Sequence, residues 1–238
     1  MKKRFVLFLC LFGIAAAVGG AILFPAKGWA WSSLLLAAAA LVLSFSAFEG
    51  WRMRAGEAAL LAVLCALSVC SRTVFVWLPH FKPVSAMTII CGMYLGPRVG
   101  FFTGAMTALV SNFLFGQGPW TPFQMLTWGI IGFLSGALGG LLKKSRILLF
   151  LHGGLCGILF SLMMDLWSMV WLAGEASLGT WLALVATALP MTVTYAVSNI
   201  LFLALLAGPI GKKLVRMQVR YGFFAACAPC GAEKTDCC

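Results

Sequence analysis

Acidic residues and histidines are scarce in this chain of 238 residues, which contains six Asp and Glu residues in total and two histidines. Catalysis by paired carboxylates and metal sites built from aspartates both need several such groups close together. The zinc-protease motif H-E-x-x-H and the G-x-S-x-G nucleophile elbow are also missing. These absences argue against an enzyme and against a bound cofactor or metal.

A nucleotide-binding loop is missing as well. The segment GPIGKK at 208–213 has the wrong spacing for the phosphate-binding motif G-x-x-x-x-G-K-[ST]. A transporter made from this chain would therefore take its energy from another subunit.

Charged residues of either sign are also rare, at 10% of the chain, whereas hydrophobic residues make up 62%. A soluble domain usually has about 25% charged residues. The sequence therefore predicts an all-α integral membrane protein embedded in the lipid bilayer. Eight apolar segments are the candidate spans. They are roughly 5–24, 31–48, 57–78, 84–95, 99–115, 123–142, 147–172 and 180–208. The first resembles a signal peptide in its basic start, but it is long and lacks a clear cleavage site, so we expect a retained helix.

The net charge of +11 comes from basic residues in short clusters between the apolar segments. If the N-terminus is cytoplasmic, strict alternation of eight helices places fourteen Lys and Arg residues inside and only Lys27 and Lys82 outside. We therefore expect a multi-pass protein of a prokaryotic cell membrane, with both termini in the cytoplasm. No basic, aromatic-rich soluble stretch is present, so a nucleic-acid partner is not expected.

Polar residues gather at one depth in the outer half of the predicted spans. Arg72, Asp165, Asn112 and Gln124 all belong to this group. Polar groups inside a membrane are costly and mark functional sites by default. Arg72 and Asp165 either pair with each other or contact a ligand, and the residues alone do not separate these alternatives. Asn112, like Thr127 and Thr192, also fits an interhelical hydrogen bond.

The expected outer loop GQGPWTP at 116–122 holds Trp120 between two prolines with fixed φ. A rigid loop that presents an indole ring suits a large, flat ligand. We expect the ligand pocket at this outer face. The candidate binding residues are Arg72, Lys82, Asn112, Gln117, Trp120, Gln124, Asp165 and Trp167.

Small residues recur at every fourth position in three of the spans. The sets are Ala58, Ala62 and Ala66; Gly100, Gly104 and Ala108; and Gly132, Gly136 and Gly140. Such faces allow helix backbones to approach closely, within one chain or against a partner.

The C-terminal tail contains Cys227, Cys230, Cys237 and Cys238. The C-x-x-C pair fits a zinc site, but adjacent cysteines are awkward ligands for one tetrahedral ion. We expect a disordered appendix, with metal or redox binding as the alternative.

Four stretches between Glu57 and Gly140 carry a resemblance to a known family. They are EAALLAVLCALSVCSR, HFKPV, LGPRVGFFTGAMTALVSNFLFGQGPWTPFQM and WGIIGFLSGALGG. They resemble the substrate-binding S components of energy-coupling factor (ECF) vitamin transporters. The resemblance implies a six-helix core at 55–212, preceded by two additional transmembrane helices at 1–54 and followed by a cytoplasmic tail at 213–238.

The resemblance also implies a function. Such a subunit binds a vitamin from outside and delivers it inward with a transmembrane coupling protein and two ATPase subunits. The face of Ala58, Ala62 and Ala66 matches the docking face for the coupling protein. The GQGPWTP variant favours cobalamin or a related corrinoid over riboflavin, thiamine, folate or a queuosine precursor. A solitary facilitator is the alternative of the same kind, and a membrane enzyme or assembly scaffold is the alternative of another class.

Overall fold

The computed structural model describes residues 53–173 and 177–224, together with residues 35, 38, 41 and 42. Its elements are α3 (Ala55–Val74), α4 (Val84–Leu95), α5 (Pro97–Phe115), α6 (Thr121–Ala137), α7 (Gly139–Leu142), α8 (Arg146–Ser168), the π-helical turn η1 (Met169–Ala173) and α9 (Leu178–Tyr221). The described part of the chain consists of helices and the loops between them, with no strand, as expected for an all-α membrane protein. The expectations for the first predicted span and for the cysteine tail lie outside the described residues.

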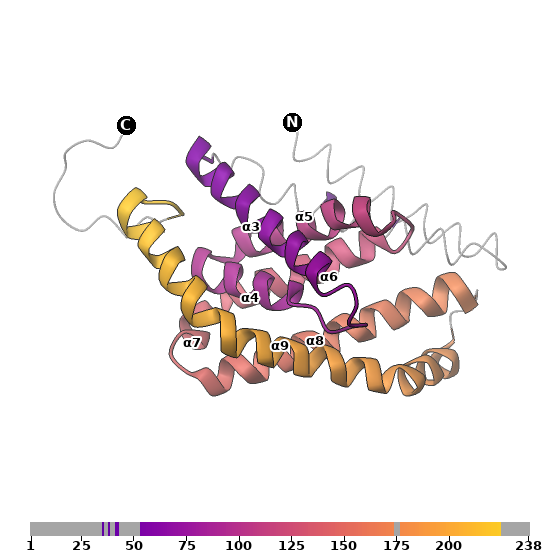
Figure 1. Cartoon of the computed structure of the whole chain (residues 1–238). Helices are drawn as coiled ribbons and strands as arrows, with labels where there is room; N and C mark the ends of the chain where they lie inside the picture. The colour runs from indigo at the N-terminus through magenta and orange to yellow at the C-terminus, as the bar shows by residue number, and fades with distance from the viewer. Residues whose placement is uncertain (1–34, 36–37, 39–40, 43–52, 174–176, 225–238) are drawn as a thin grey trace.

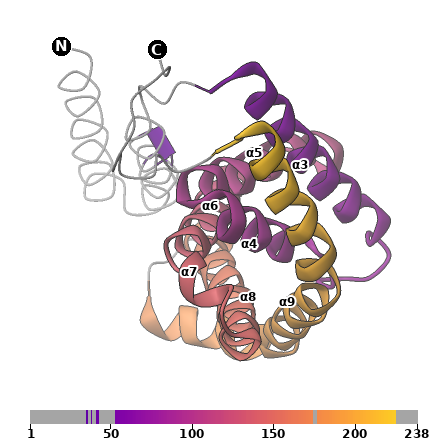
Figure 2. The same cartoon turned by 90° about the vertical axis from the view of Figure 1, so that its left-hand side faces the viewer.

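Four of the helices are long and apolar enough to cross a membrane. They are Ala55–Val74, Pro97–Phe115, Arg146–Trp171 and Leu178–Tyr221. The apolar helix α4 has only 12 residues and is too short to cross alone. Every residue of α4 except Tyr94 is buried. Figure 2 shows why, because α4 lies near the centre and the other helices surround it.

Glycine and proline residues mark where α5 and α6 begin and where α4 and α5 end. Gly96 has a φ of 99° between α4 and α5, and Gly116 has a φ of 100° after α5. Both values favour glycine, which has no Cβ to clash. Pro97 and Pro122 then occupy the first turn of the helix that follows, where the missing N–H costs nothing.

Helices α4, α5 and α6 pack with their backbones in contact. A Cβ added to Gly100 would lie 2.2 Å from the carbonyl oxygen of Gly132, and one added to Gly92 would meet the same oxygen at 2.2 Å. The small-residue faces predicted on the fifth and sixth spans are therefore confirmed as packing faces. Gly140 is the exception, because nothing lies within 4 Å of its added Cβ.

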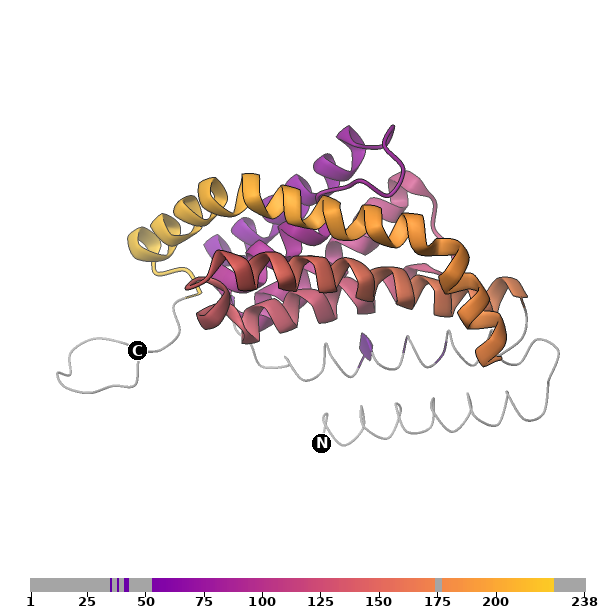
Figure 3. The same cartoon turned by 90° about the horizontal axis from the view of Figure 1, so that it is seen from below.

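The helices form an elongated bundle with two distinct ends (Figures 1 and 3). The loops 75–83 and 116–120 and the η1 turn lie at one end, which we call the Trp120 end. The loop 143–145 and the last turns of α9 lie at the opposite end, which we call the Tyr94 end. Helices α8 and α9 pack side by side along the bundle.

The last helix departs from the sequence prediction. It was expected to end near residue 208, where the apolar run ends, but it continues to Tyr221 and passes through Pro190 and Pro209. Tertiary contacts support this extension, because Gln218 Nε2 donates to the Tyr94 carbonyl at 3.0 Å and Leu214 is buried. The helix therefore crosses the expected core boundary at residue 212.

The end of α9 is fastened to the start of α3. The Glu57 carboxylate accepts from the Arg54 backbone N–H at 3.0 Å and from the Phe224 N–H at 2.8 Å. Arg54 forms an ion pair with Glu57 at 3.2 Å and also donates to the Gly222 carbonyl. We call these contacts the Glu57 clasp.

One residue of the second predicted span is described in contact with the bundle. Leu41 is buried and clusters with Phe101 and Ala105 of α5. At this position the additional N-terminal segment packs against the core.

Candidate ligand-binding site

Arg72 is the charged residue around which the Trp120 end is organised. Its Nη1 donates to the Asn112 side-chain oxygen at 2.9 Å and to the Ser111 hydroxyl. Its guanidinium carbon lies 4.6 Å from the ring centroid of Phe115 and 5.5 Å from that of Trp128. Aromatic faces attract a cation at these distances. The charge is therefore held by hydrogen-bond acceptors and by two rings.

Asn112 connects three helices in this region. It is fully buried, and its Nδ2 donates to the Thr121 hydroxyl at 2.9 Å and to Gln124 Oε1 at 3.0 Å. Its oxygen receives the Arg72 donor, so α3, α5 and α6 meet at one amide. Asn112 therefore forms interhelical hydrogen bonds in this structure, which is one of the two roles that the sequence left open for it.

Gln117 fixes the loop between α5 and α6. Its Oε1 accepts from the Thr121 hydroxyl at 3.0 Å, and its Nε2 donates to the Leu109 carbonyl at 3.1 Å. Both groups of this exposed amide are thus used within the chain. The loop is held by hydrogen bonds as well as by its prolines.

Trp120 and Trp167 meet at the same end of the bundle. Their ring centroids are 5.8 Å apart and their planes are at 80°, an edge-to-face arrangement. Gly118 permits the approach, because a Cβ there would lie 2.2 Å from the Trp120 ring. The indole N–H of Trp167 is buried and has no hydrogen-bond partner within the described residues. A buried indole N–H normally has a partner, so this donor is available to an acceptor on a ligand.

Asp165 does not pair with Arg72. Among the described residues the only ion pair is the one between Arg54 and Glu57, at the opposite end. The Asp165 Oδ2 atom is buried and has no hydrogen-bond partner in this part of the chain. The pairing alternative is therefore not realised in this structure.

Lys82 brings a second positive charge to the Trp120 end. Its Nζ lies 5.7 Å from the centroid of the Phe115 ring, which also contacts Arg72. Burial and the nearby Arg72 charge lower the pKa of Lys82. Two cations therefore share one aromatic ring, an arrangement that an anionic or electron-rich ligand would stabilise.

Several residues in this region were not predicted as site residues. Trp128 stacks on Phe160 with centroids 5.0 Å apart, and Phe160 contacts Tyr195 at 5.1 Å. The Tyr195 hydroxyl is hydrogen-bonded to His80 Nδ1 at 2.9 Å. Aromatic residues such as Trp128 and Phe160 are not distinctive in a sequence this hydrophobic, so they give no signal of a site. Tyr195 did give such a signal, because the chain has only three tyrosines.

The alanine face of α3 lines a separate apolar hollow. Ala58, Ala62 and Ala66 are exposed, and with Met106 and Val110 of α5 they line a space of about 320 Å³. Unlike the glycine faces of α5 and α6, this face contributes its small residues to the surface of the described bundle. It therefore has the form of a site for a partner helix.

Comparison with known proteins gives a family match. The family model described as "ECF-type riboflavin transporter, S component" matches residues 53–216. No curated protein and no solved structure matches significantly. The matched range begins just before α3 and ends within α9, so it includes both the Trp120 end and the alanine face.

Proposed function

Because the chain belongs to the family of ECF-type riboflavin transporter S components, we propose that it binds a flat aromatic vitamin at the Trp120 end. Family membership makes it a membrane-embedded binding subunit for a vitamin and a transporter subunit, not an enzyme. The identity of the vitamin and the residues that hold it are the parts we propose.

The arrangement around Arg72 is the observation that carries the proposal. Arg72 and Lys82 lie on the same Phe115 ring, and the described residues place no carboxylate in an ion pair with either cation. Asn112 and Ser111 accept hydrogen bonds from Arg72 on one side. A ligand with carbonyl or phosphate oxygens would complete the coordination of these donors.

The Trp120–Trp167 pair supplies the aromatic part of the proposed pocket. Two large rings at an edge-to-face angle leave ring faces available for stacking on a planar ligand. The Trp167 N–H supplies a directional donor beside them. These features suit a flavin, and the family description names riboflavin. They also suit a corrinoid, which the sequence of the 116–122 loop favours.

We also propose an orientation and partners. The Trp120 end faces the outside, because the opposite end carries Lys143, Arg146, Lys212 and Lys213, as the positive-inside rule requires of a cytoplasmic end. The transmembrane coupling protein docks on the hollow over Ala58, Ala62 and Ala66. Two ATPase subunits bound to that partner supply the energy.

Two experiments test the binding proposal. The first is mass spectrometry of the small molecule that the detergent-purified protein retains. The second is titration of ligand-free protein with riboflavin and, separately, with cobalamin, followed by tryptophan fluorescence. We expect saturable binding of one of these ligands and quenching that is lost in Trp120→Ala. No binding of any vitamin, with the protein folded, would overturn the proposal.

A further inference from the structure

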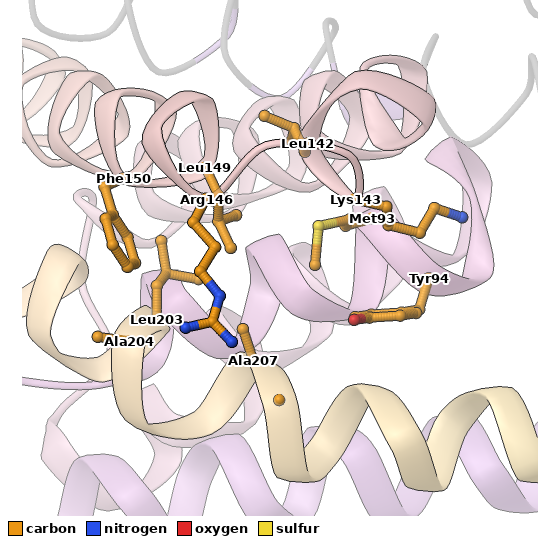
Figure 4. A pocket seen from close by; sticks show the side chains of 11 residues that line it. Met93, Tyr94, Leu142, Lys143, Arg146, Leu149, Phe150, Leu203, Ala204 and Ala207 are labelled. Atoms are coloured by element: carbon orange, nitrogen blue, oxygen red, sulfur yellow. The ribbon is translucent and has the colours of Figure 1, made fainter.

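A second hollow lies at the Tyr94 end, on the side of the bundle away from the alanine face. It has a volume of about 240 Å³ and opens between α4, the start of α8 and the middle of α9 (Figure 4). Met93, Leu149, Phe150 and Leu203 line its apolar part. Its polar part consists of Tyr94, Lys143 and Arg146. The hollow therefore combines an apolar wall with donors and no acidic residue.

Two of the donors at this hollow make no polar contact within the described part of the chain. Neither the Arg146 guanidinium nor the Tyr94 hydroxyl has a hydrogen-bond or ion-pair partner among the described residues. Figure 4 shows the Arg146 guanidinium reaching toward Ala207, with the Tyr94 hydroxyl directed toward the same space. The Lys143 ammonium lies 5.7 Å from the centroid of the Tyr94 ring. The Arg146 and Tyr94 donors thus face one space that contains no acceptor side chain, whereas the Lys143 ammonium lies beside the Tyr94 ring and is directed away from Arg146.

The size of the hollow limits what it holds. Pockets for whole drug-sized ligands measure about 300–1,000 Å³. At about 240 Å³ this hollow is smaller than the usual range. A small anionic group, or one part of a larger amphiphile, fits it better than a complete vitamin.

The surroundings favour an amphiphile. On the outer faces of the helices that form the hollow, Leu151 of α8 is 59% exposed and Leu205 of α9 is 60% exposed. In a membrane-embedded bundle such side chains face acyl chains. Tyrosine and lysine side chains mark the level of the headgroups. The hollow therefore lies at the level expected for lipid headgroups.

We infer that this hollow binds the phosphate of an acidic phospholipid. Arg146 neutralises the phosphate charge, Tyr94 donates a hydrogen bond to a phosphate oxygen, and the acyl chains run along α8 and α9. Lys143 adds positive charge beside Tyr94. Basic pockets between transmembrane helices are suited to anionic headgroups. The inference requires only membrane embedding and is independent of the proposed vitamin site.

The test uses the full-length protein in nanodiscs of phosphatidylcholine with a minor fraction of phosphatidylglycerol. Native mass spectrometry after release from the disc measures the ratio of the two lipids that remain bound. We expect the wild type to retain phosphatidylglycerol selectively. The double variant Lys143→Gln/Arg146→Gln should lose that selectivity by about tenfold or more.

A matched control is available on α9. Lys212→Gln/Lys213→Gln removes the same charge from exposed positions at the same end, but neither residue lines the hollow. Its lipid selectivity should stay close to that of the wild type. An equal loss in both double variants would show a general surface-charge effect and would overturn the inference.

Two milder variants keep the test informative if the charge variant does not fold. Tyr94→Phe removes only the hydroxyl and should weaken retention by about fivefold. Ala204→Leu adds side-chain volume at an exposed position that lines the hollow, and it should displace the lipid. Unchanged phosphatidylglycerol retention in both variants would place the lipid elsewhere.

A final competition experiment distinguishes a bound lipid from a bound soluble phosphate compound. Inorganic phosphate and glycerol 3-phosphate are added at millimolar concentration before release from the disc. We expect neither to displace the lipid, because both lack the acyl chains. Displacement by either compound would overturn the lipid assignment in favour of a soluble phosphate ligand.

Discussion

The rings of Trp120 and Trp167 pack edge to face, with centroids 5.8 Å apart, and join the loop after α5 to the end of α8. If this pair lines the vitamin pocket, Trp120→Ala should lower vitamin affinity by about tenfold, or about 1.4 kcal/mol. Isothermal titration with the vitamin identified by mass spectrometry measures the change. Trp77→Ala is the control, because Trp77 is 88% exposed in the loop 75–83 at the same end. Equal losses in the two variants would argue against a specific role for Trp120.

Asn112 should matter for stability as well as for binding. Asn112→Ala leaves Arg72, Thr121 and Gln124 each without one hydrogen-bond partner. An unsatisfied buried polar group costs about 1–3 kcal/mol, so we expect a clear fall in the thermal unfolding midpoint together with weaker vitamin binding. Thr127→Val is the control, because the buried Thr127 hydroxyl donates only to Phe123 in its own helix. A midpoint as high in Asn112→Ala as in Thr127→Val would contradict this prediction.

The alanine face should be needed for uptake and not for binding. Ala62→Trp fills the hollow on α3 and should abolish vitamin uptake by cells that contain the coupling subunits. Vitamin affinity of the purified protein should stay unchanged, because none of the candidate binding residues lines the hollow that contains Ala62. Val63→Trp places the same indole side chain at a neighbouring position that is 55% exposed and does not line the hollow. Uptake that survives Ala62→Trp would refute docking on this face.

His80 should make stability depend on pH. Burial and the Lys82 charge lower the pKa of His80 in the folded protein, whereas in the unfolded chain it is about 6.5. As pH falls below this value the unfolded state binds the proton first, so stability decreases until the folded-state pKa is passed. Thermal unfolding at a series of pH values measures this slope. His80→Asn should reduce it, since asparagine tolerates the φ of 61° at this position and does not titrate.

The Glu57 clasp should hold the end of α9 without affecting the vitamin site. Glu57→Ala removes the acceptor of the Phe224 N–H and the ion-pair partner of Arg54. We expect faster amide hydrogen exchange at residues 222–224 and unchanged vitamin affinity, measured by mass spectrometry and titration. Arg98→Ala removes an exposed charge at the same end and serves as the control. Slow exchange in Glu57→Ala would mean that other contacts hold this segment.

The helical class and most helix positions could be predicted from sequence because lipid imposes long apolar runs and internally satisfied backbones. The same rule explains the error at the end of α9. The apolar run ends near residue 208, but the helix continues because Gly211 lets the Tyr94 ring approach its backbone and Gln218 donates a hydrogen bond to the Tyr94 carbonyl. These are tertiary contacts, and residue spacing along one segment does not contain them.

The candidate site could be predicted only in part, for a similar reason. Intramembrane polar residues are visible in a sequence, so Arg72, Asn112 and Gln124 were identified together. Their pairing was not visible, and Arg72 turned out to bond Asn112 and not Asp165. Phe115 contacts both Arg72 and Lys82, yet an aromatic residue in an apolar run carries no mark of that role. Whether these residues bind the vitamin remains a prediction.

Helix α9 is long enough to connect the two ends of the bundle directly. Tyr195 contacts His80 and Phe160 near the Trp120 end, and Gly222 is fastened to Arg54 at the start of the alanine-faced helix. The segment between them spans about 40 Å at the helical rise of about 1.5 Å per residue. Pro209 interrupts it by removing one backbone hydrogen bond, so bending concentrates there. We therefore expect Pro209 to be the point at which a displacement of Tyr195 would bend α9 before it reached α3.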